Sequence, residues 1–149
     1  MLLGSINHVS IAVTDLPAAM TFFRPLLEFL GYAVGTIEYH PPAETSLVVN
    51  LNERNGVAFN VWQAKRDHPF DVYEPGLHHV AFNVAFHDQV DEVAALVPTI
   101  GGTLLEGPGE YPFGPGGYYA VYFLGPDRLK FEVVHMPLAE QRCRERGVL

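Results

Sequence analysis

Apolar and polar residues alternate in two stretches of the chain that resemble each other. Residues 6–13 (INHVSIAV) and 77–84 (LHHVAFNV) carry apolar side chains at every second position, a pattern typical of a β-strand with one packed face. The two stretches correspond at a constant offset of 71 positions, which places His8 and His79 at equivalent points. The sequence therefore predicts a similar strand near the start of each half.

A second correspondence marks the ends of the two halves. Residues 59–61 (FNV) lie 72 positions before residues 131–133 (FEV), so Asn60 corresponds to Glu132. A repeat with a period of about half the chain indicates one structural unit that occurs twice. The predicted division of the single domain 1–149 is a first unit at 5–64, a connector at 65–76, a second unit at 77–136 and a tail at 137–149.

Helix and strand signals give both units the same order of elements. The segment TDLP at 14–17 offers an N-cap and a proline suited to a first helical turn, and Gly31 offers a stop. We expect helices over residues 18–30 and about 87–97. The other predicted strands are 32–39, 46–51 and 57–63 in the first unit, and 103–105, 118–124 and 129–134 in the second. The tail either forms a short helix or frays.

The longest irregular stretch is residues 106–117 (EGPGEYPFGPGG). Five glycines and three prolines surround Tyr111 and Phe113 there. A loop of this kind beside a pocket is often a lid, and the alternative is a wide hairpin connection that ignores the ligand.

Four polar residues are expected on the faces of the sheets that the helices leave open. His8 and His79 share their strand faces with small or polar residues. Glu132 alternates out of phase with its apolar neighbours and so points to the same side, and Asn60 has the same phase in the first unit. If the two units pack about a pseudo-twofold axis, the four positions converge.

Two neutral imidazoles and one carboxylate on one concave surface suit a divalent metal with open coordination positions. Fe²⁺ is favoured, with Zn²⁺, Ni²⁺, Mn²⁺ or Co²⁺ as alternatives, and Asn60 can add at most a weak neutral oxygen. The competing interpretation is that His8 and His79 are half-buried polar residues and that Glu132 forms a surface pair with Lys130. The duplicated histidine position, in matching phase with a carboxylate, favours the metal site.

The composition of the chain limits the classes of molecule that it is expected to bind. With 149 residues, 48% of them hydrophobic, the chain is long enough for a sizeable core. Nine Lys and Arg against 17 Asp and Glu give a net charge of -8, which disfavours nucleic acids and anionic membranes as partners. The single Cys143 excludes an internal disulfide and cysteine-based metal spacing. Without an apolar run of about 18 residues or a signal-peptide pattern, we expect a cytoplasmic protein.

The paired modules open with H-V-x-hydrophobic-x-V and close with hydrophobic-E-hydrophobic-hydrophobic. In this they resemble the vicinal oxygen chelate superfamily, which includes glyoxalase I, extradiol dioxygenases and the bleomycin resistance proteins. The resemblance covers residues 5–136 and implies an α+β fold, in which two βαβββ modules form a cupped, mostly antiparallel eight-stranded sheet. It implies a metal bound by His8, His79 and Glu132, from one chain or across a homodimer. Asn60 falls where many relatives place a fourth ligand, usually glutamate.

The resemblance implies an enzyme that binds a small oxygenated substrate to the metal through vicinal oxygens. In glyoxalase I and the epimerases the fourth-position glutamate commonly removes a proton, which Asn60 cannot do. Residues 121–128 (VYFLGPDR) keep, imperfectly, the spacing from a tyrosine to the glutamate seen in extradiol dioxygenases, and Tyr122 becomes the candidate catalytic residue. The upstream histidine of those enzymes would fall at residues 113–116, where this chain has none.

The reaction class therefore stays open between dioxygenase-like and lyase or isomerase chemistry. The alternative is a non-catalytic drug-binding or resistance protein of the bleomycin-resistance type, and a third option is attack on an electrophilic antibiotic, as in fosfomycin resistance. Among the other histidines, His78 is expected on the packed face of its strand, opposite His79, and His40 and His68 lie in proline-containing loops.

Overall fold

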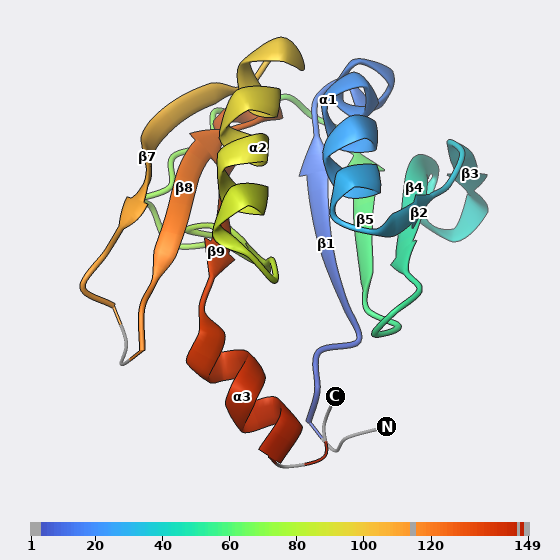
Figure 1. The fold of residues 1–149 in the computed structure, drawn as a ribbon. Helices are drawn as coiled ribbons and strands as arrows, with labels where there is room; N and C mark the ends of the chain where they lie inside the picture. Colours follow the sequence, from blue (N-terminus) through green and yellow to red (C-terminus); the bar gives the residue numbers. More distant parts are fainter. Residues whose placement is uncertain (1–3, 114–115, 146, 148–149) are drawn as a thin grey trace. The chain divides into compact units, whose positions relative to one another are not determined.

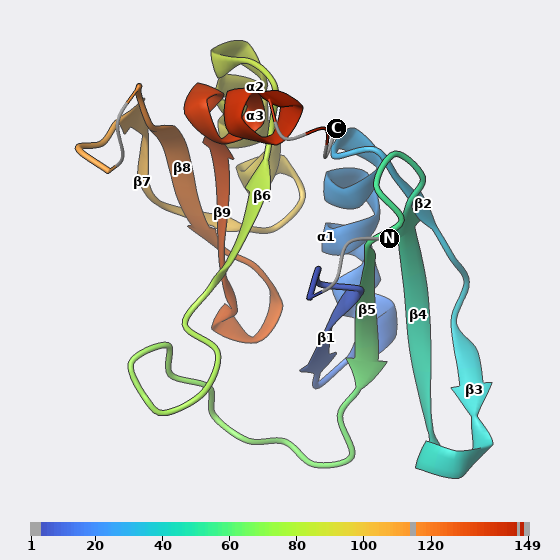
Figure 2. The same ribbon diagram turned by 90° about the horizontal axis from the view of Figure 1, so that it is seen from below.

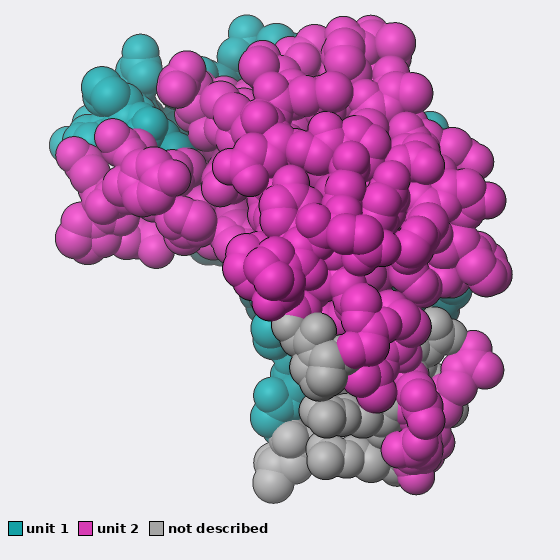
Figure 3. All heavy atoms as spheres, turned by 60° about the vertical axis from the view of Figure 1, so that its left-hand side comes forward, with its two compact units in different colours: residues 1–70 teal, residues 71–149 magenta. Residues whose placement is uncertain are grey.

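The computed structural model describes residues 4–113, 116–145 and 147, and the chain forms two compact units, residues 1–70 and 71–149 (Figure 3). Each unit contains one β-sheet with an α-helix packed against it (Figure 1). Among the described residues, none of the helices is long and apolar enough to cross a bilayer.

The first unit holds a five-stranded sheet in the order β1-β5-β4-β2, with β3 also paired to β4. The pair β1–β5 is parallel and the other pairs are antiparallel. Helix α1 packs against β2, β4 and β5. The elements are β1 (His8–Val13), α1 (Leu16–Phe29), β2 (Tyr32–Val34), β3 (Glu38–His40), a 3-10 turn (Pro41–Ala43), β4 (Thr45–Asn52) and β5 (Ala58–Gln63).

The second unit holds a four-stranded sheet in the order β6-β9-β8-β7, with β6 at the edge beside β9 (Figure 2). The pair β6–β9 is parallel and the other pairs are antiparallel. Helix α2 packs against β7, β8 and β9. The elements are β6 (Val80–Asn83), α2 (His87–Thr99), β7 (Thr103–Glu110), β8 (Tyr119–Leu124), a 3-10 turn (Pro126–Arg128), β9 (Lys130–His135) and α3 (Pro137–Glu145).

The register of the two sheets reproduces the sequence repeat. Ser10 lies opposite Asn60 on the parallel pair of the first unit, and Ala81 lies opposite Glu132 on the parallel pair of the second. Asn60 and Glu132 therefore occupy the same place in their units, as the offset predicts. The predicted α+β class of two βαβββ modules with mostly antiparallel pairing is confirmed. The expected eight strands are found as two sheets, five strands in the first unit and four in the second, because the strand predicted over 32–39 is divided in two.

The apolar face of each sheet packs on its helix. In the first unit, Phe23 of α1 and Phe59 of β5 are buried with their ring centroids 5.9 Å apart. In the second unit, the ring of Phe131 on β9 lies 6.4 Å from that of Phe82 and 6.0 Å from that of Phe123. Burial of one such side chain contributes about 1.5–3 kcal/mol. This packing fixes which residues of each strand are left for the opposite face.

Asp15 fixes the start of α1. Its Oδ1 accepts a hydrogen bond from the Ala18 backbone N–H at 2.9 Å, and Pro17 occupies the first turn, where no intrahelical N–H bond is lost. The helix therefore begins at Leu16, with Asp15 as its cap and Pro17 in its first turn, as the cap and proline signals predict. Gly31 follows the helix with a φ of 82°, the left-handed conformation that commonly ends helices.

The predicted continuous strand 32–39 is wrong because it is interrupted at residues 35–37, which separates β2 from β3. The interrupted strand carries one residue more than the facing stretch of β4, so it forms a bulge. The Gly35 carbonyl accepts a hydrogen bond from the Arg24 guanidinium at 3.0 Å, and a Cβ at Gly35 would lie 2.5 Å from the Val49 carbonyl oxygen. The absence of a side chain permits this close approach.

Three boundaries in the second unit also differ from the prediction. Strand β7 runs to Glu110 and so includes residues 106–110 of the predicted loop 106–117. Shifts in its register with β8 allow the glycines and the proline of this stretch to lie within the strand. The lid interpretation stays a prediction for the rest of that loop, of which residues 114–115 lie outside the described residues. Strand β6 begins at Val80 rather than at residue 77, so His79 directly precedes the strand. Helix α2 ends at Thr99, beyond the predicted end at about residue 97.

Replacing Asp15 with alanine removes the oxygen that caps the Ala18 N–H. We expect the free energy of unfolding to fall by about 1 kcal/mol, measured by urea denaturation followed by circular dichroism. Asp15→Asn is the matched control, because it keeps an acceptor oxygen and should lose clearly less stability. Equal losses in the two variants would show that the charge of Asp15, and not its hydrogen bond, fixes the helix start.

Candidate metal centre

Glu132 is the polar centre of the second sheet. It lies within β9, and only 1% of its surface is exposed. The neighbouring Phe131 packs in the core, and the ring of His135, in the same phase as Phe131, contacts His87 of α2. Glu132 therefore points to the face opposite the helix. A buried carboxylate is costly to charge unless hydrogen-bond donors or cations compensate.

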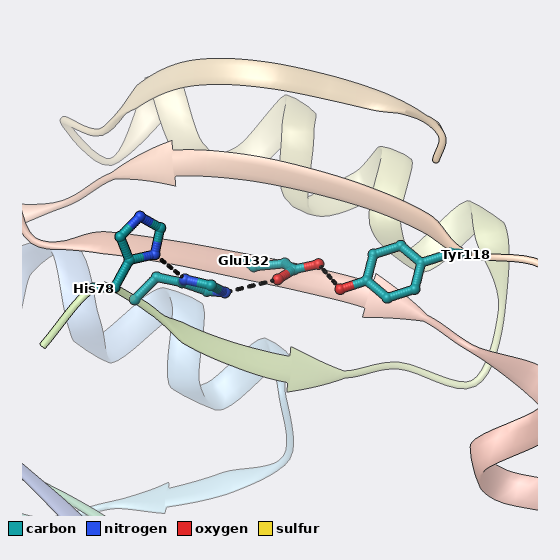
Figure 4. Close-up of polar contacts among 4 residues, drawn as sticks. His78, Tyr118 and Glu132 are labelled. Carbon is teal, nitrogen blue, oxygen red and sulfur yellow. Dashed lines mark hydrogen bonds and ion pairs between the residues drawn. The ribbon is translucent and has the colours of Figure 1, made fainter. Parts of the chain in front are cut away.

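His79 and Tyr118 contact the Glu132 carboxylate (Figure 4). His79 Nε2 lies 3.1 Å from Oε2, and the Tyr118 hydroxyl donates a short hydrogen bond to Oε1. His79 lies directly before β6 and reaches the carboxylate because β6 runs parallel to β9 with Ala81 opposite Glu132. Both carboxylate oxygens are thus engaged by residues of one unit.

Aromatic rings stand around this carboxylate. The ring centroid of Tyr122 on β8 lies 6.3 Å from that of His79 and 5.3 Å from that of Tyr111, both edge to face. Phe113 is stacked on Tyr111 at 5.8 Å and meets Tyr118 edge to face at 5.5 Å. Such rings suit contact with a planar or apolar part of a ligand.

The environment of the carboxylate keeps both tyrosine hydroxyls protonated. Burial, followed by the hydrogen bond to Glu132, raises the pKa of Tyr118 to about 12, although a hydrogen bond with Tyr122 opposes the shift. The pKa of Tyr122 is also raised, first by burial and then by hydrogen bonds with Glu132 and Tyr118. At neutral pH both hydroxyls are therefore hydrogen-bond donors and not bases.

The first unit presents a related polar set. Asn60 occupies the place of Glu132, and its Nδ2 donates to Ser10 Oγ at 3.3 Å. Its Oδ1 is buried and lacks a hydrogen-bond partner within the described residues, a situation that ordinarily costs about 1–3 kcal/mol. His8 is exposed on β1, and its Nδ1 lies 2.9 Å from Asn7 Oδ1. An unpaired carbonyl oxygen at this position suits a donor or a cation.

Part of the predicted site is assembled inside the second unit. His79 and Glu132 are in contact, and Tyr122 stands beside them. His8 belongs to the first unit, and no cluster of three or more His, Cys, Asp or Glu side chains able to hold a metal occurs among the residues that the structure describes. The complete set of His8, His79 and Glu132 therefore stays a prediction.

Two contacts of the site were missed by sequence reasoning. The prediction that His78 lies on the packed face is wrong, because β6 begins only at Val80; His78 is exposed and its Nδ1 lies 2.7 Å from His79 Nδ1. The contact of Tyr118 with Glu132 was also not predicted; the only sequence signal for it is that Tyr118 has the same strand phase as Tyr122. Nor does Glu132 form a surface pair with Lys130: Glu132 is buried, and Lys130 Nζ lies 5.2 Å from the centre of the Tyr122 ring.

The donor atoms of the second unit fit a divalent metal. Two ligand atoms that each lie about 2.1 Å from one ion are about 3 Å apart when they occupy neighbouring coordination positions. His79 Nε2 and Glu132 Oε2 are 3.1 Å apart. A nitrogen and an oxygen donor without sulfur suit Fe²⁺, Mn²⁺, Ni²⁺, Co²⁺ or Zn²⁺. Tyr118 holds the other carboxylate oxygen, as groups behind metal ligands usually do.

Tyr118→Phe removes a donor from the buried Glu132 carboxylate. We expect the metal-free protein to lose about 1–3 kcal/mol of unfolding free energy at neutral pH. Because the pKa of Tyr118 is raised in the folded state, this advantage of the wild type is full below about pH 10, the ordinary tyrosine pKa, and is lost as the pH rises through about 12. Urea titrations at several pH values measure the difference.

Tyr119→Phe is the matched control, because the adjacent Tyr119 hydroxyl donates at 2.7 Å to the exposed Asp91. Its loss should be smaller, since water replaces an exposed partner. Equal effects of Tyr118→Phe and Tyr119→Phe would contradict the importance of the buried carboxylate.

Comparisons with known proteins agree with the fold. The profile of the Glyoxalase/Bleomycin resistance protein/Dioxygenase superfamily matches residues 5–133. The chain is 30% identical over 132 residues to the uncharacterized protein YqjT of Bacillus subtilis (strain 168). The matched region covers 86% of this chain and 96% of YqjT. A candidate glyoxalase from Bacillus halodurans has a similar structure, with a TM-score of 0.72 and 26% identity over 90% of this chain and 97% of its own.

A further similar structure is that of a variant of the fosfomycin resistance protein FosX from Listeria monocytogenes, complexed with Mn(II) and 1S,2S-dihydroxypropylphosphonic acid. Its TM-score is 0.60 at 16% identity, over 94% of this chain and 98% of its own. Three findings lead to one conclusion: the repeated units, the registers in which Asn60 and Glu132 occupy equivalent places, and the profile match over most of the chain. This chain belongs to the glyoxalase/bleomycin resistance protein/dioxygenase superfamily.

Proposed function

We propose that this protein is a divalent-metal-dependent enzyme that binds a small oxygenated substrate through two neighbouring oxygens. The proposed metal ligands are His8, His79 and Glu132. The observation that carries the proposal is the 3.1 Å approach of His79 Nε2 to Oε2 of a carboxylate that is 1% exposed. A buried carboxylate facing an imidazole nitrogen makes a strong site for a cation.

A metal bound there would stabilise negative charge that develops on substrate oxygens. The chain's own groups prepare the site. Glu132 supplies the compensating negative charge, and the Tyr118 hydroxyl holds Oε1, so Oε2 is the oxygen that faces His79. We assign Tyr122 as the candidate catalytic residue, because its ring adjoins that of His79 and its protonated hydroxyl can donate to a substrate oxygen.

The donor set supports Fe²⁺ as the favoured metal, with Zn²⁺, Ni²⁺, Mn²⁺ and Co²⁺ as alternatives. Two imidazoles and one carboxylate would leave positions open for a substrate. Asn60 Oδ1, which lacks a hydrogen-bond partner among the described residues, is a further neutral oxygen that could bind the same ion. Because it carries no charge, its contribution would be weak.

The reaction is proposed as dioxygenase-like or as that of a lyase or isomerase. Asn60 cannot remove a proton, which disfavours glyoxalase I chemistry in its simple form. The aromatic rings of Tyr111, Phe113 and Tyr122 favour a planar substrate such as a catechol. The fold relative FosX holds Mn(II) together with a molecule that carries hydroxyl groups on neighbouring carbons, which supports binding through vicinal oxygens.

The second candidate function is binding without catalysis, as in the bleomycin resistance proteins. The same aromatic rings support it, since they suit an apolar or planar ligand with or without a metal. The net charge of -8 supports a small molecule over nucleic acid as the partner in either case. We further propose a cytoplasmic homodimer, in which the ligands come from one chain or from two.

Metal analysis separates the two functions. Protein purified anaerobically without chelator should contain about one divalent metal ion per chain, measured by elemental analysis. His79→Ala and Glu132→Gln should lose it, because each removes a donor atom of the proposed site. His87→Ala is the control: His87 lies on α2 with a half-exposed side chain, away from Glu132, and this variant should keep the metal.

The identity of the metal then selects the substrates to test. Iron directs the assay to a panel of catechols under oxygen, and other metals direct it to lyase and isomerase substrates. A wild-type protein without metal, which also takes up none of the five ions on reconstitution, would contradict the proposed enzyme and support the binding protein.

A further inference from the structure

Both candidate histidines are held by the residue that precedes them. In the first unit, His8 Nδ1 lies 2.9 Å from Asn7 Oδ1. In the second unit, His79 Nδ1 lies 2.7 Å from His78 Nδ1 (Figure 4). The two pairs correspond in the sequence repeat at the offset of 71 positions. In both units, therefore, the residue before the histidine contacts its Nδ1 atom, although that residue is asparagine in one unit and histidine in the other.

The direction of the hydrogen bond in the first unit follows from chemistry. An amide oxygen only accepts hydrogen bonds, so His8 Nδ1 must carry the proton. A neutral imidazole has a single N–H, and the Nε2 atom of His8 therefore keeps its lone pair. Asn7 sets His8 in the tautomer that can bind a metal through Nε2, with or without a metal present.

The second unit allows two directions. Without a metal, His78 can donate to His79 Nδ1, while His79 Nε2–H donates to Glu132 Oε2 at 3.1 Å. When a cation takes the place of the Nε2 proton, His79 must carry its proton on Nδ1, and His78 Nδ1 becomes the acceptor. Histidine can serve both arrangements because each ring nitrogen can donate or accept.

We propose that Asn7 and His78 are positioning residues that orient the rings of His8 and His79 and direct both Nε2 atoms toward a divalent metal. The proposal rests on the proposed function for the metal and extends it to two residues outside the ligand set. Histidine ligands commonly donate their second N–H to a carboxylate, a carbonyl or water, and loss of that partner typically lowers metal affinity by about 10–100-fold. Here the side chain one position earlier takes that place in both units.

The test uses Zn²⁺ as a diamagnetic probe with the full-length protein. Ring ¹⁵N chemical shifts report the tautomer of each histidine, and competition with a chromophoric chelator reports the Zn²⁺ affinity. We expect the metal-free wild type to hold His8 with its proton on Nδ1, and Asn7→Ala to lose this preference. We expect Zn²⁺ affinity to fall by about 10–100-fold in Asn7→Ala and in His78→Phe.

The repeat provides reciprocal control variants. Asn7→His and His78→Asn exchange the residues of the two units and keep an acceptor at each position, so both should retain near-wild-type affinity and keep the Nδ1 proton in the Zn²⁺ complex. A purely structural role would not distinguish His78→Phe from His78→Asn in the ring shifts.

Two outcomes separate this proposal from the proposed function. Unchanged tautomers and unchanged Zn²⁺ affinity in Asn7→Ala and His78→Phe would overturn the positioning roles. A wild-type protein that binds no Zn²⁺, but whose His8 tautomer depends on Asn7, would support the role of Asn7 on the ring and remove the metal from the proposed function.

Discussion

The buried carboxylate of Glu132 is the constraint on which the site depends. A charge that is 1% exposed in a sheet needs partners in fixed places. The parallel pairing of β6 with β9 brings His79 to one oxygen, and Tyr118, directly before β8, contacts the other. On the other face of the sheet, the ring of Phe131 packs near those of Phe82 and Phe123, and this apolar core holds the strands in place. The strand pairing and the core packing of the second unit therefore position the groups around Glu132.

The two units have the same strand arrangement but carry different residues at equivalent positions. Asn60 occupies the place of Glu132, and its unpaired oxygen adds no charge. Of these two equivalent positions, the one in the second unit carries the carboxylate, while in both units the residue before the histidine contacts its Nδ1. Under the proposed function, Glu132 would supply the charge of the metal site and His8 a neutral ligand. A second carboxylate at Asn60 would bring a base, which this chain lacks at that position.

The features set by alternation could be predicted from the sequence, and those set by irregular backbone could not. Strand phase placed Glu132 on the open face, because Phe131 and Val133 must pack. The interruption at Gly35 depends on a bulge and on a hydrogen bond from Arg24 in α1, neither of which leaves a periodic signal. His78 was misplaced for a related reason, since the strand begins after it and alternation no longer decides its direction.

The central claim is that His8 joins His79 and Glu132 around one metal ion. X-ray absorption spectroscopy of the loaded protein, at the edge of the metal found, counts imidazole ligands directly. The account predicts a first shell of nitrogen and oxygen with two imidazoles in the wild type and one in His8→Ala. Two imidazoles in His8→Ala, or a shell without imidazole in the wild type, would contradict it.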